Sequence, residues 1–291
     1  EFANSDSWVI LSPIEQSIKR KIEAVGTPLK DWDINIYRGV LTGYNEAFII
    51  STEKRKEILA NCQSEDERKR TAELIRPILR GRDIKRYGYN WAGLYLIATF
   101  PSRHYDIEQY PAVKEYLLSF GIERLEQTGK EHNVNGEKIK ARKKTSNKWF
   151  ETQDSISYWE DFSKPKMLWK RVGSILRFCY NDNETLGLDS TCFATGENIE
   201  FICCVLNSPM GHYLLKDAPK TGTGDLLVSV QAIEPIKIPQ VGLETNSEFK
   251  KLLESLIKTD SPSNEKEISR KVLKLYDLSL DEQSYIETNF T

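Results

Sequence analysis

The stretch KPKMLWKRVGSILRF, residues 164–178, interleaves cationic and apolar side chains and contains no acid. Successive side chains of an extended strand point to opposite faces. In a strand, Lys164, Lys166 and Lys170 would therefore share one face, and Met167 and Trp169 would lie on the other. The stretch predicts a strand whose cationic face can run beside a phosphate backbone. An ordinary solvent-exposed sheet face is the alternative.

Apolar runs on both sides of this stretch predict further strands, and amphipathic or charged segments predict helices. Strands are expected within residues 34–37, 47–50, 94–100, 175–180, 225–230 and 233–239. Helices are expected within residues 12–26, 51–79 and 197–215, the last as two short helices, and within residues 241–291. Capping boxes at Ser12 with Glu15 and at Ser279 with Glu282 support the first and last of these helices.

The predicted fold class is therefore α+β, with a mixed central β region, flanking helices and a C-terminal helical hairpin. We expect three parts: a helical connector in residues 1–30, a central domain in residues 31–240 and a helical segment in residues 241–291. No repeat is visible in the sequence.

Size and composition favour a soluble cytoplasmic protein that does not bind a membrane. The chain has 291 residues and a mean hydropathy of −0.51, and no run of residues approaches the roughly 18 apolar positions of a membrane span. Its five cysteines show no paired C-x-x-C spacing, as expected of a reducing compartment. Because the first residue is Glu1 rather than methionine, we expect a piece of a longer polypeptide.

The charge is unevenly distributed along the chain. A net charge of −2 argues against a general polyanion binder. Residues 138–148 nevertheless contain six cations and no acid, and residues 164–177 contain five cations and no acid. Residues 241–291 hold ten acids against seven bases. Positive charge is thus concentrated in the middle of the chain.

The cationic run 138–148 is followed directly by Trp149 and Phe150. Cations interleaved with aromatic rings can neutralise phosphates while a ring stacks on a base. The alternative is a solvated loop. The residues predicted to contact a nucleic-acid backbone are Lys140, Arg142, Lys143, Lys144 and Lys148, together with Lys170 and Arg171.

RPILRGRDIKRYGY, residues 76–89, sets five cations against one acid, Asp83. Arginines can bond phosphate or guanine edges with two parallel hydrogen bonds. We therefore predict Arg80, Arg82 and Arg86 as base readers, and Lys85 as a further contact. Asp83 and Lys85 also form the acid-x-Lys pair of metal-dependent nucleases, but such a site needs further carboxylates.

YRGVLTGYNEAF, residues 37–48, predicts a strand, a tight turn and a second strand. Arg38, Thr42 and Asn45 would present hydrogen-bonding groups near the bend, as a DNA contact requires. Alternatively, Thr42 and Asn45 satisfy the backbone of the turn itself. The DNA contact is favoured for Arg38 and the turn for Asn45.

KTGTGDLLVSV, residues 220–230, lacks the pattern of a phosphate-binding loop, although Thr221 and Thr223 could donate hydrogen bonds to a ligand. The three histidines have no metal-ligand spacing, and there is neither a G-x-S-x-G motif nor a Pro-Pro dipeptide. The sequence thus predicts no catalytic, cofactor-binding or metal-binding residue.

The segments together resemble the TaqI-like C-terminal specificity domain of Type IIG restriction-modification proteins. The residues that carry the resemblance are WVILSPIEQSIKRKIEAVGTPLKDW (8–32), INIYRGVLTGYNEAF (34–48), IRPILRGRDIKRYGY (75–89), KPKMLWKRV (164–172) and LLVSVQAIEPIKIP (226–239).

In that family a nuclease and an adenine methyltransferase that uses S-adenosylmethionine precede the specificity domain. The resemblance implies that residues 31–240 recognise double-stranded DNA without catalysis. It also implies that the parent chain carries the methyltransferase and nuclease, with S-adenosylmethionine and Mg as their cofactors. The alternatives are an autonomous Mg-dependent nuclease and a protein-interaction module that docks on a methyltransferase.

Overall fold

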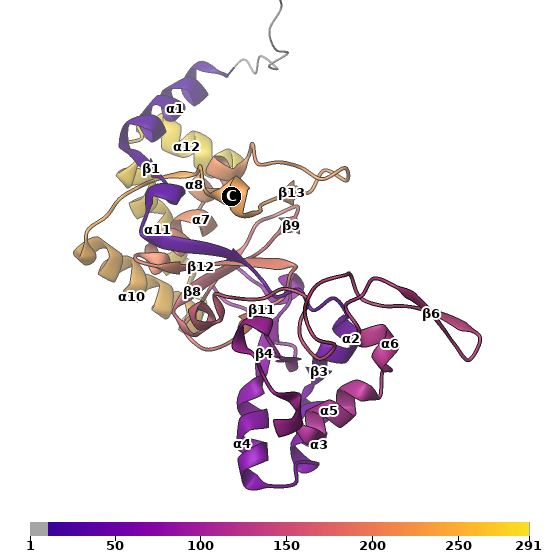
Figure 1. Cartoon of the computed structure of the whole chain (residues 1–291). Helices are drawn as coiled ribbons and strands as arrows, with labels where there is room; N and C mark the ends of the chain where they lie inside the picture. The colour runs from indigo at the N-terminus through magenta and orange to yellow at the C-terminus, as the bar shows by residue number, and fades with distance from the viewer. Residues whose placement is uncertain (1–10, 291) are drawn as a thin grey trace, which may run out of the picture. The chain divides into compact units, whose positions relative to one another are not determined.

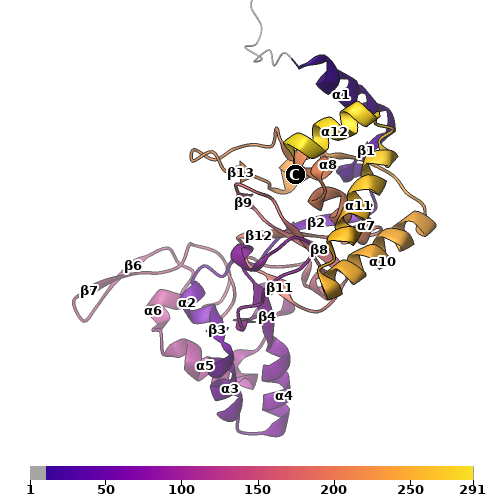
Figure 2. The same cartoon turned by 180° about the vertical axis from the view of Figure 1, so that it is seen from behind.

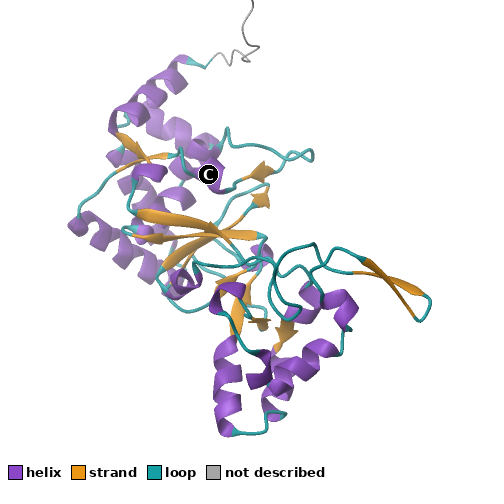
Figure 3. Cartoon of the chain, viewed as in Figure 1, coloured by secondary structure: helices purple, strands orange, loops and turns teal. Residues whose placement is uncertain are grey.

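The computed structural model describes residues 11–290, which form two compact units. One unit is Asn35–Gly196, and the other combines the described residues up to Ile34 with those from Glu197 onward. Along the sequence, the boundaries between the two units fall after Ile34 and after Gly196. The predicted boundaries fall after residues 30 and 240. The mixture of helices and small sheets confirms the α+β class (Figures 1 and 3).

The first sheet of the Asn35–Gly196 unit is built on the strand predicted from residues 164–178. Its order is β10 (Phe178–Asn181), β8 (Lys166–Lys170), β12 (Thr191–Gly196) and β2 (Ile34–Arg38). Central β8 is antiparallel to both neighbours, and Trp169 lies opposite Phe178 and Cys192. Because both faces of β8 are covered, Met167, Leu168 and Trp169 are all buried.

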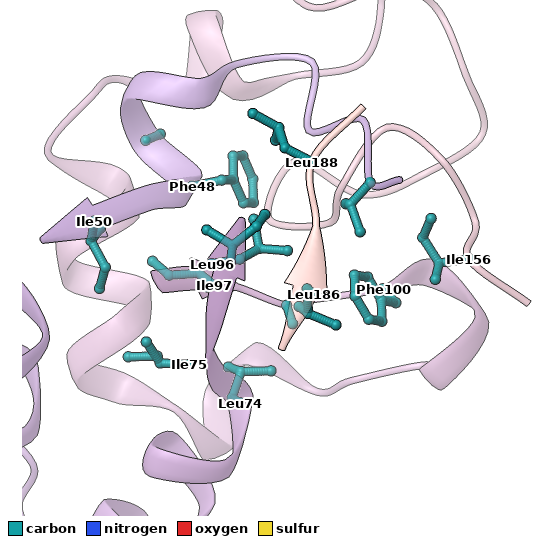
Figure 4. Close-up of a cluster of buried hydrophobic side chains, with 14 of the residues drawn as sticks. Phe48, Ile50, Leu74, Ile75, Leu96, Ile97, Phe100, Ile156, Leu186 and Leu188 are labelled. Atoms are coloured by element: carbon teal, nitrogen blue, oxygen red, sulfur yellow. The ribbon is translucent and has the colours of Figure 1, made fainter. Parts of the chain in front are cut away.

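The second sheet of this unit packs with helices around the hydrophobic core. Its order is β11 (Leu186–Gly187), β4 (Ile75–Leu79), β5 (Leu94–Ile97) and β3 (Ile49–Ser51). The helices are α2 (Asn45–Phe48), α3 (Thr52–Ala60), α4 (Glu65–Leu74), α5 (Pro111–Leu118) and α6 (Ile122–Leu125). Phe48, Leu96, Phe100 and Leu186 meet in the core between them (Figure 4).

Short elements complete this unit. They are the hairpin strands β6 (Glu131–Val134) and β7 (Glu137–Lys140), strand β9 (Val172–Gly173) and 3-10 turns at Gly81–Asp83, Pro101–Arg103, Ile107–Gln109 and Trp159–Ser163.

The other unit is mainly helical. Its helices are α1 (Pro13–Val25), α7 (Ile199–Asn207), α8 (Pro209–Leu215), α9 (Val230–Ile233), α10 (Leu243–Thr259), α11 (Pro262–Leu275) and α12 (Leu280–Asn289), with a 3-10 turn at Leu29–Asp31. Strands β1 (Gly26–Pro28) and β14 (Lys237–Pro239) pair antiparallel, and β13 is Leu226–Leu227. Both predicted capping boxes are present.

Two strand predictions need correction. Residues 47–50 were expected to form a strand, but Ala47 and Phe48 end helix α2 and the strand begins at Ile49. The hydroxyl of Thr42 donates to Asn45 Oδ1 and accepts from the Tyr44 amide, which favours a helical turn. Residues 225–230 were expected to form one strand, but β13 ends at Leu227 and Val230 begins α9.

Within residues 11–290, none of the helices is both long enough and apolar enough to cross a lipid bilayer.

Candidate nucleic-acid interface

Four cations lie at one end of the sheet β10-β8-β12-β2. Lys170 ends β8 and lies opposite Thr191, the first residue of β12. The Gly39 amide donates to the Thr191 carbonyl at 3.0 Å, which places the end of β2 beside the start of β12. Because Phe178 lies opposite Trp169, the residue before Phe178 also falls at this end. The cationic end is Arg38, Lys170, Arg171 and Arg177.

A basic cavity of about 250 Å³ opens beside Lys170. Its lining includes the cations Arg82, Lys85, Lys170 and Arg177, all of them exposed. Within the described part of the chain, no carboxylate forms an ion pair with any of these four side chains. Their charge is therefore available to an anion, and four positive groups around one small cavity favour a phosphate.

The cavity depends on a close approach between two segments. A Cβ on Gly81 would lie 2.7 Å from Lys170 Cγ, so only glycine leaves room for the lysine side chain. The Gly81 amide donates to Ser190 Oγ at 3.0 Å, which joins the segment to the start of β12. A backbone turn and a strand end are thus held together with Lys170 between them.

Arg80 positions this turn rather than facing open solvent. Its Nε and Nη2 atoms donate to the Asp83 carboxylate at 3.0 and 2.8 Å, and the Arg80 amide donates to the same carboxylate at 2.8 Å. Burial raises the pKa of Asp83, but the hydrogen bonds from Arg80 outweigh it and the pKa lies below its usual value. The Arg80 guanidinium is thus engaged with Asp83 in the turn that contains Arg82, and its assignment as a base reader stays a prediction.

Arg38 and Arg171 both contact Asp189. Arg38 Nη2 lies 3.5 Å from Asp189 Oδ2, and Arg171 Nη1 donates to the Asp189 carbonyl at 3.0 Å. The Tyr158 hydroxyl donates to the Arg38 carbonyl at 2.8 Å and holds the strand end in place. Asp189 therefore offsets part of the positive charge at the cationic end.

Two of the predicted DNA contacts are buried and serve the fold. Arg142 is 4% exposed, and its guanidinium donates to four main-chain carbonyls, those of Leu125, Thr42, Glu151 and Trp149, at 2.7 to 2.8 Å. Burial lowers the pKa of Arg142 to about 10. Thr42 is fully buried. Neither side chain can reach a phosphate, which corrects both predictions.

Lys166 also departs from the cationic face expected of the strand. It is fully buried, and its Nζ atom donates to the carbonyls of Phe162 and Asn183 and to Asn181 Oδ1. Burial lowers the pKa of Lys166 to about 7. The strand therefore presents Lys170, at its end, and not a row of three lysines.

The remaining predicted contacts are dispersed. Lys140 is exposed at the end of β7, and Lys143, Lys144 and Lys148 are exposed on the segment that follows the β6–β7 hairpin. Arg86 is half-buried, with Cζ 5.5 Å from the Tyr87 ring centroid. Asn45 is exposed and accepts the Thr42 hydroxyl, as the turn alternative expects. Thr221 and Thr223 belong to the helical unit, where their hydroxyls hydrogen-bond each other at 2.8 Å.

Sequence reasoning did not single out Arg177 or Gly173, although it did predict a sharp turn at Gly81. Arg177 was part of the run 164–177, but nothing in the sequence showed that a turn after β9 would return it to Lys170. A Cβ on Gly173 would lie 3.9 Å from Lys170 Nζ, so both glycines flank the same lysine. The presence of glycines between cations was the one available signal.

Solved structures with a similar fold include two restriction enzymes. The Type IIL restriction-modification enzyme MmeI, determined in complex with DNA, matches with a TM-score of 0.58 and 10% identity over 91% of this chain and 36% of its own. The type IIG restriction endonuclease BpuSI matches with a TM-score of 0.50 and 14% identity over 93% of this chain and 32% of its own. The chain thus spans about a third of the length of either enzyme.

A comparison with curated proteins finds no match. The family model of the TaqI-like C-terminal specificity domain matches residues 76–226, which include all of the basic cavity and most of the sheet beside it. That match covers more than half of the sequence. The chain therefore belongs to the family of TaqI-like C-terminal specificity domains.

Proposed function

We propose that this chain is a sequence-specific recognition module for double-stranded DNA and that it performs no catalysis itself. The observation that carries the proposal is the basic cavity, where Arg82, Lys85, Lys170 and Arg177 converge without an ion-pair partner among the described residues. Membership of a specificity-domain family supports the same assignment.

The cationic end would fix the module on the duplex through backbone phosphates. Each phosphate that a lysine or arginine neutralises releases condensed counterions, so that binding weakens as salt rises. Such contacts set position and orientation and carry no sequence information by themselves. Sequence choice therefore requires additional side chains that reach base edges.

We further propose that the module directs the methyltransferase and endonuclease of a Type II restriction-modification protein. MmeI and BpuSI, two of the solved structures with a similar fold, are described as restriction enzymes, and in each the fold occupies about a third of the chain. S-adenosylmethionine and Mg would then be held by those other parts. No residue of the basic cavity has a role toward either cofactor in this proposal.

The nuclease alternative draws no support from the described residues. Asp83 is 5% exposed and its carboxylate is occupied by Arg80. No group of three His, Cys, Asp or Glu side chains capable of holding a metal occurs within residues 11–290. In the interaction-module alternative, the basic segments only keep the protein soluble. The experiment described next distinguishes this alternative from DNA recognition.

The test is equilibrium binding of the 291-residue chain to a fluorescent mixed-sequence duplex, followed by selection from a randomised duplex library. The proposal predicts binding that weakens steeply between 50 and 200 mM salt, on the scale of a protein with several phosphate contacts, and enrichment of a defined sequence. Absence of binding, or binding that is indifferent to salt, would contradict it and favour the interaction module. Cleavage of the duplex in Mg²⁺ that is lost in Asp83→Ala would favour the nuclease.

A further inference from the structure

The β6–β7 hairpin stands out from the rest of the Asn35–Gly196 unit, as both views show (Figures 1 and 2). Its strands pair antiparallel from Glu131 opposite Lys140 to Val134 opposite Glu137. They are joined by only two residues, Asn135 with φ of 51° and Gly136 with φ of 86°. Two left-handed residues in an Asn-Gly pair make the tight turn whose twist matches a hairpin. The ribbon is therefore narrow and well defined at its tip.

The two faces of this ribbon differ in exposure. Residues directly opposite each other share a face, so Asn133 and Lys138 lie on the same face, with Glu131 and Lys140 beside them. All four of these side chains are exposed. On the other face His132, Val134 and Ile139 are half-buried. One face of the ribbon is thus polar and exposed to solvent.

The base of the ribbon is braced. The buried Arg142, just beyond β7, bonds four carbonyls, and the Arg142 carbonyl accepts from the Gly129 amide at 2.8 Å. His132 Nε2, on the half-buried face, lies 3.6 Å from Glu126 Oε2. An isolated two-stranded ribbon is marginally stable in water. These contacts join the base of the ribbon to the rest of the Asn35–Gly196 unit.

We infer that the β6–β7 ribbon enters the major groove of DNA and that Asn133 and Lys138 read bases there. The inference rests on the proposed function. The major groove, about 12 Å wide and 8.5 Å deep, admits a two-stranded ribbon. Positive charge near the ribbon matches a polyanion, because Lys130, Lys140, Lys143 and Lys144 are exposed at its base.

The two proposed readers suit that groove. Asn can pair with the N6 and N7 edge of adenine, and Lys can donate to the O6 and N7 atoms of guanine. Cβ atoms of directly opposite residues are about 5 Å apart, and successive base pairs are about 3.4 Å apart. Asn133 and Lys138 can therefore contact two neighbouring base pairs. The Lys residues at the base of the ribbon would meet the flanking phosphates.

The experiment compares the chain with its Asn133→Ala and Lys138→Ala variants by selection from randomised duplexes. Glu137→Gln, on the opposite face of the same ribbon, is the matched control. The selected duplex is then remade with a single 7-deaza purine at the base pair where the variant has lost its preference. This base lacks the N7 acceptor in the major groove and leaves the minor groove unchanged. Binding of each protein to each duplex is measured at one salt concentration.

The inference predicts that each Ala variant loses its preference at one base or at two adjacent bases, by about tenfold. The wild-type chain should lose a similar factor on the 7-deaza duplex, and the variant should lose nothing further. Glu137→Gln should retain the wild-type preference. Unchanged preference in both Ala variants, uniform weakening on all duplexes, or an equal 7-deaza loss in variant and wild type would overturn the inference. If the wild-type chain binds no duplex, the proposed function fails first.

Discussion

Gly81 and Lys170 lie against each other beside the basic cavity, so that a Cβ on Gly81 would be 2.7 Å from Lys170 Cγ and 3.1 Å from the Ser190 carbonyl oxygen. The lysine stem can shift, but the strand end at Ser190 cannot do so easily. The direction of Lys170 is therefore set by the absence of a side chain at position 81.

This contact predicts the effect of Gly81→Ala. The added methyl group should displace Lys170 and weaken duplex binding by about fivefold, the order of one lost phosphate contact. Overpacking should also lower the free energy of unfolding by about 1 to 3 kcal/mol. Gly88→Ala is the control, because a Cβ there meets nothing within 4 Å. Equal binding by the two variants would show that Lys170 is not held in this way.

Asp189 predicts a gain of affinity. Its carboxylate lies 3.5 Å from Arg38, and its charge would repel a phosphate at the cationic end. Asp189→Asn should strengthen duplex binding by several-fold at low salt and steepen its salt dependence by up to about 0.9 for one freed cation. Glu115→Gln, an exposed change on helix α5, should have a smaller effect. A fluorescence titration that shows weaker binding for Asp189→Asn would place the DNA elsewhere.

Arg142 predicts a loss of stability rather than of DNA contact. Arg142→Ala leaves four carbonyls without their donor and removes a buried side chain, which should cost about 3 kcal/mol in the free energy of unfolding. Lys144→Ala, two residues later and exposed, should change it by less than about 0.5 kcal/mol. Urea denaturation of both variants measures the difference. Similar midpoints would mean that Arg142 is not the brace described.

Lys166 predicts a pH dependence of stability. Burial lowers its pKa to about 7, whereas the unfolded chain keeps a lysine pKa of about 10.4. Between these values the unfolded state binds a proton that the folded state does not, so the free energy of unfolding rises with pH, by at most about 1.4 kcal/mol per unit. The free energy of unfolding of the wild type, minus that of Lys166→Met, should therefore increase by about 2 kcal/mol from pH 7 to pH 9.

The measurement is urea denaturation of both proteins at pH 7, 8 and 9. Buried thiols such as Cys179, whose pKa burial raises to about 12, also titrate differently in the folded and unfolded states. They are common to both proteins and cancel in the difference. A difference that stays constant with pH would show that Lys166 remains protonated throughout.

The sequence predicted the features that depend on neighbouring residues, and it did not predict those that depend on contacts between residues far apart in the chain. The strand at Lys166–Lys170 followed from its apolar run, and the helices from their caps and periodicity. The clusters of cations indicated a nucleic acid, with a solvated surface as the alternative, and the family resemblance specified double-stranded DNA. Lys166 and Lys170 nevertheless differ in exposure, although they lie four residues apart on one strand. Lys166 is buried and its Nζ atom donates to the carbonyls of Phe162 and Asn183, whereas Lys170 is exposed.

The same limit applies to the arginines. Arg142 and Arg82 occupy similar cationic runs, yet Arg142 is buried among four carbonyls and Arg82 lines the cavity. Tertiary contacts that join residues 17 to 100 positions apart decide between these roles. No local pattern contains that information. The convergence of Arg82, Lys85, Lys170 and Arg177 is likewise a product of the folded chain.

The most direct test of the account is the salt dependence of duplex binding by a variant in which Arg82, Lys85, Lys170 and Arg177 are all changed to Ala, measured beside the wild type. A second quadruple variant, with the exposed Lys56, Lys69, Lys251 and Lys258 changed to Ala, matches the loss of charge outside the cavity. If the cavity and its rim hold phosphates, the slope of log affinity against log salt should become shallower by about 3.6 in the first variant, about 0.9 for each lost contact, and by much less in the second. Equal slopes for the two variants would contradict the account.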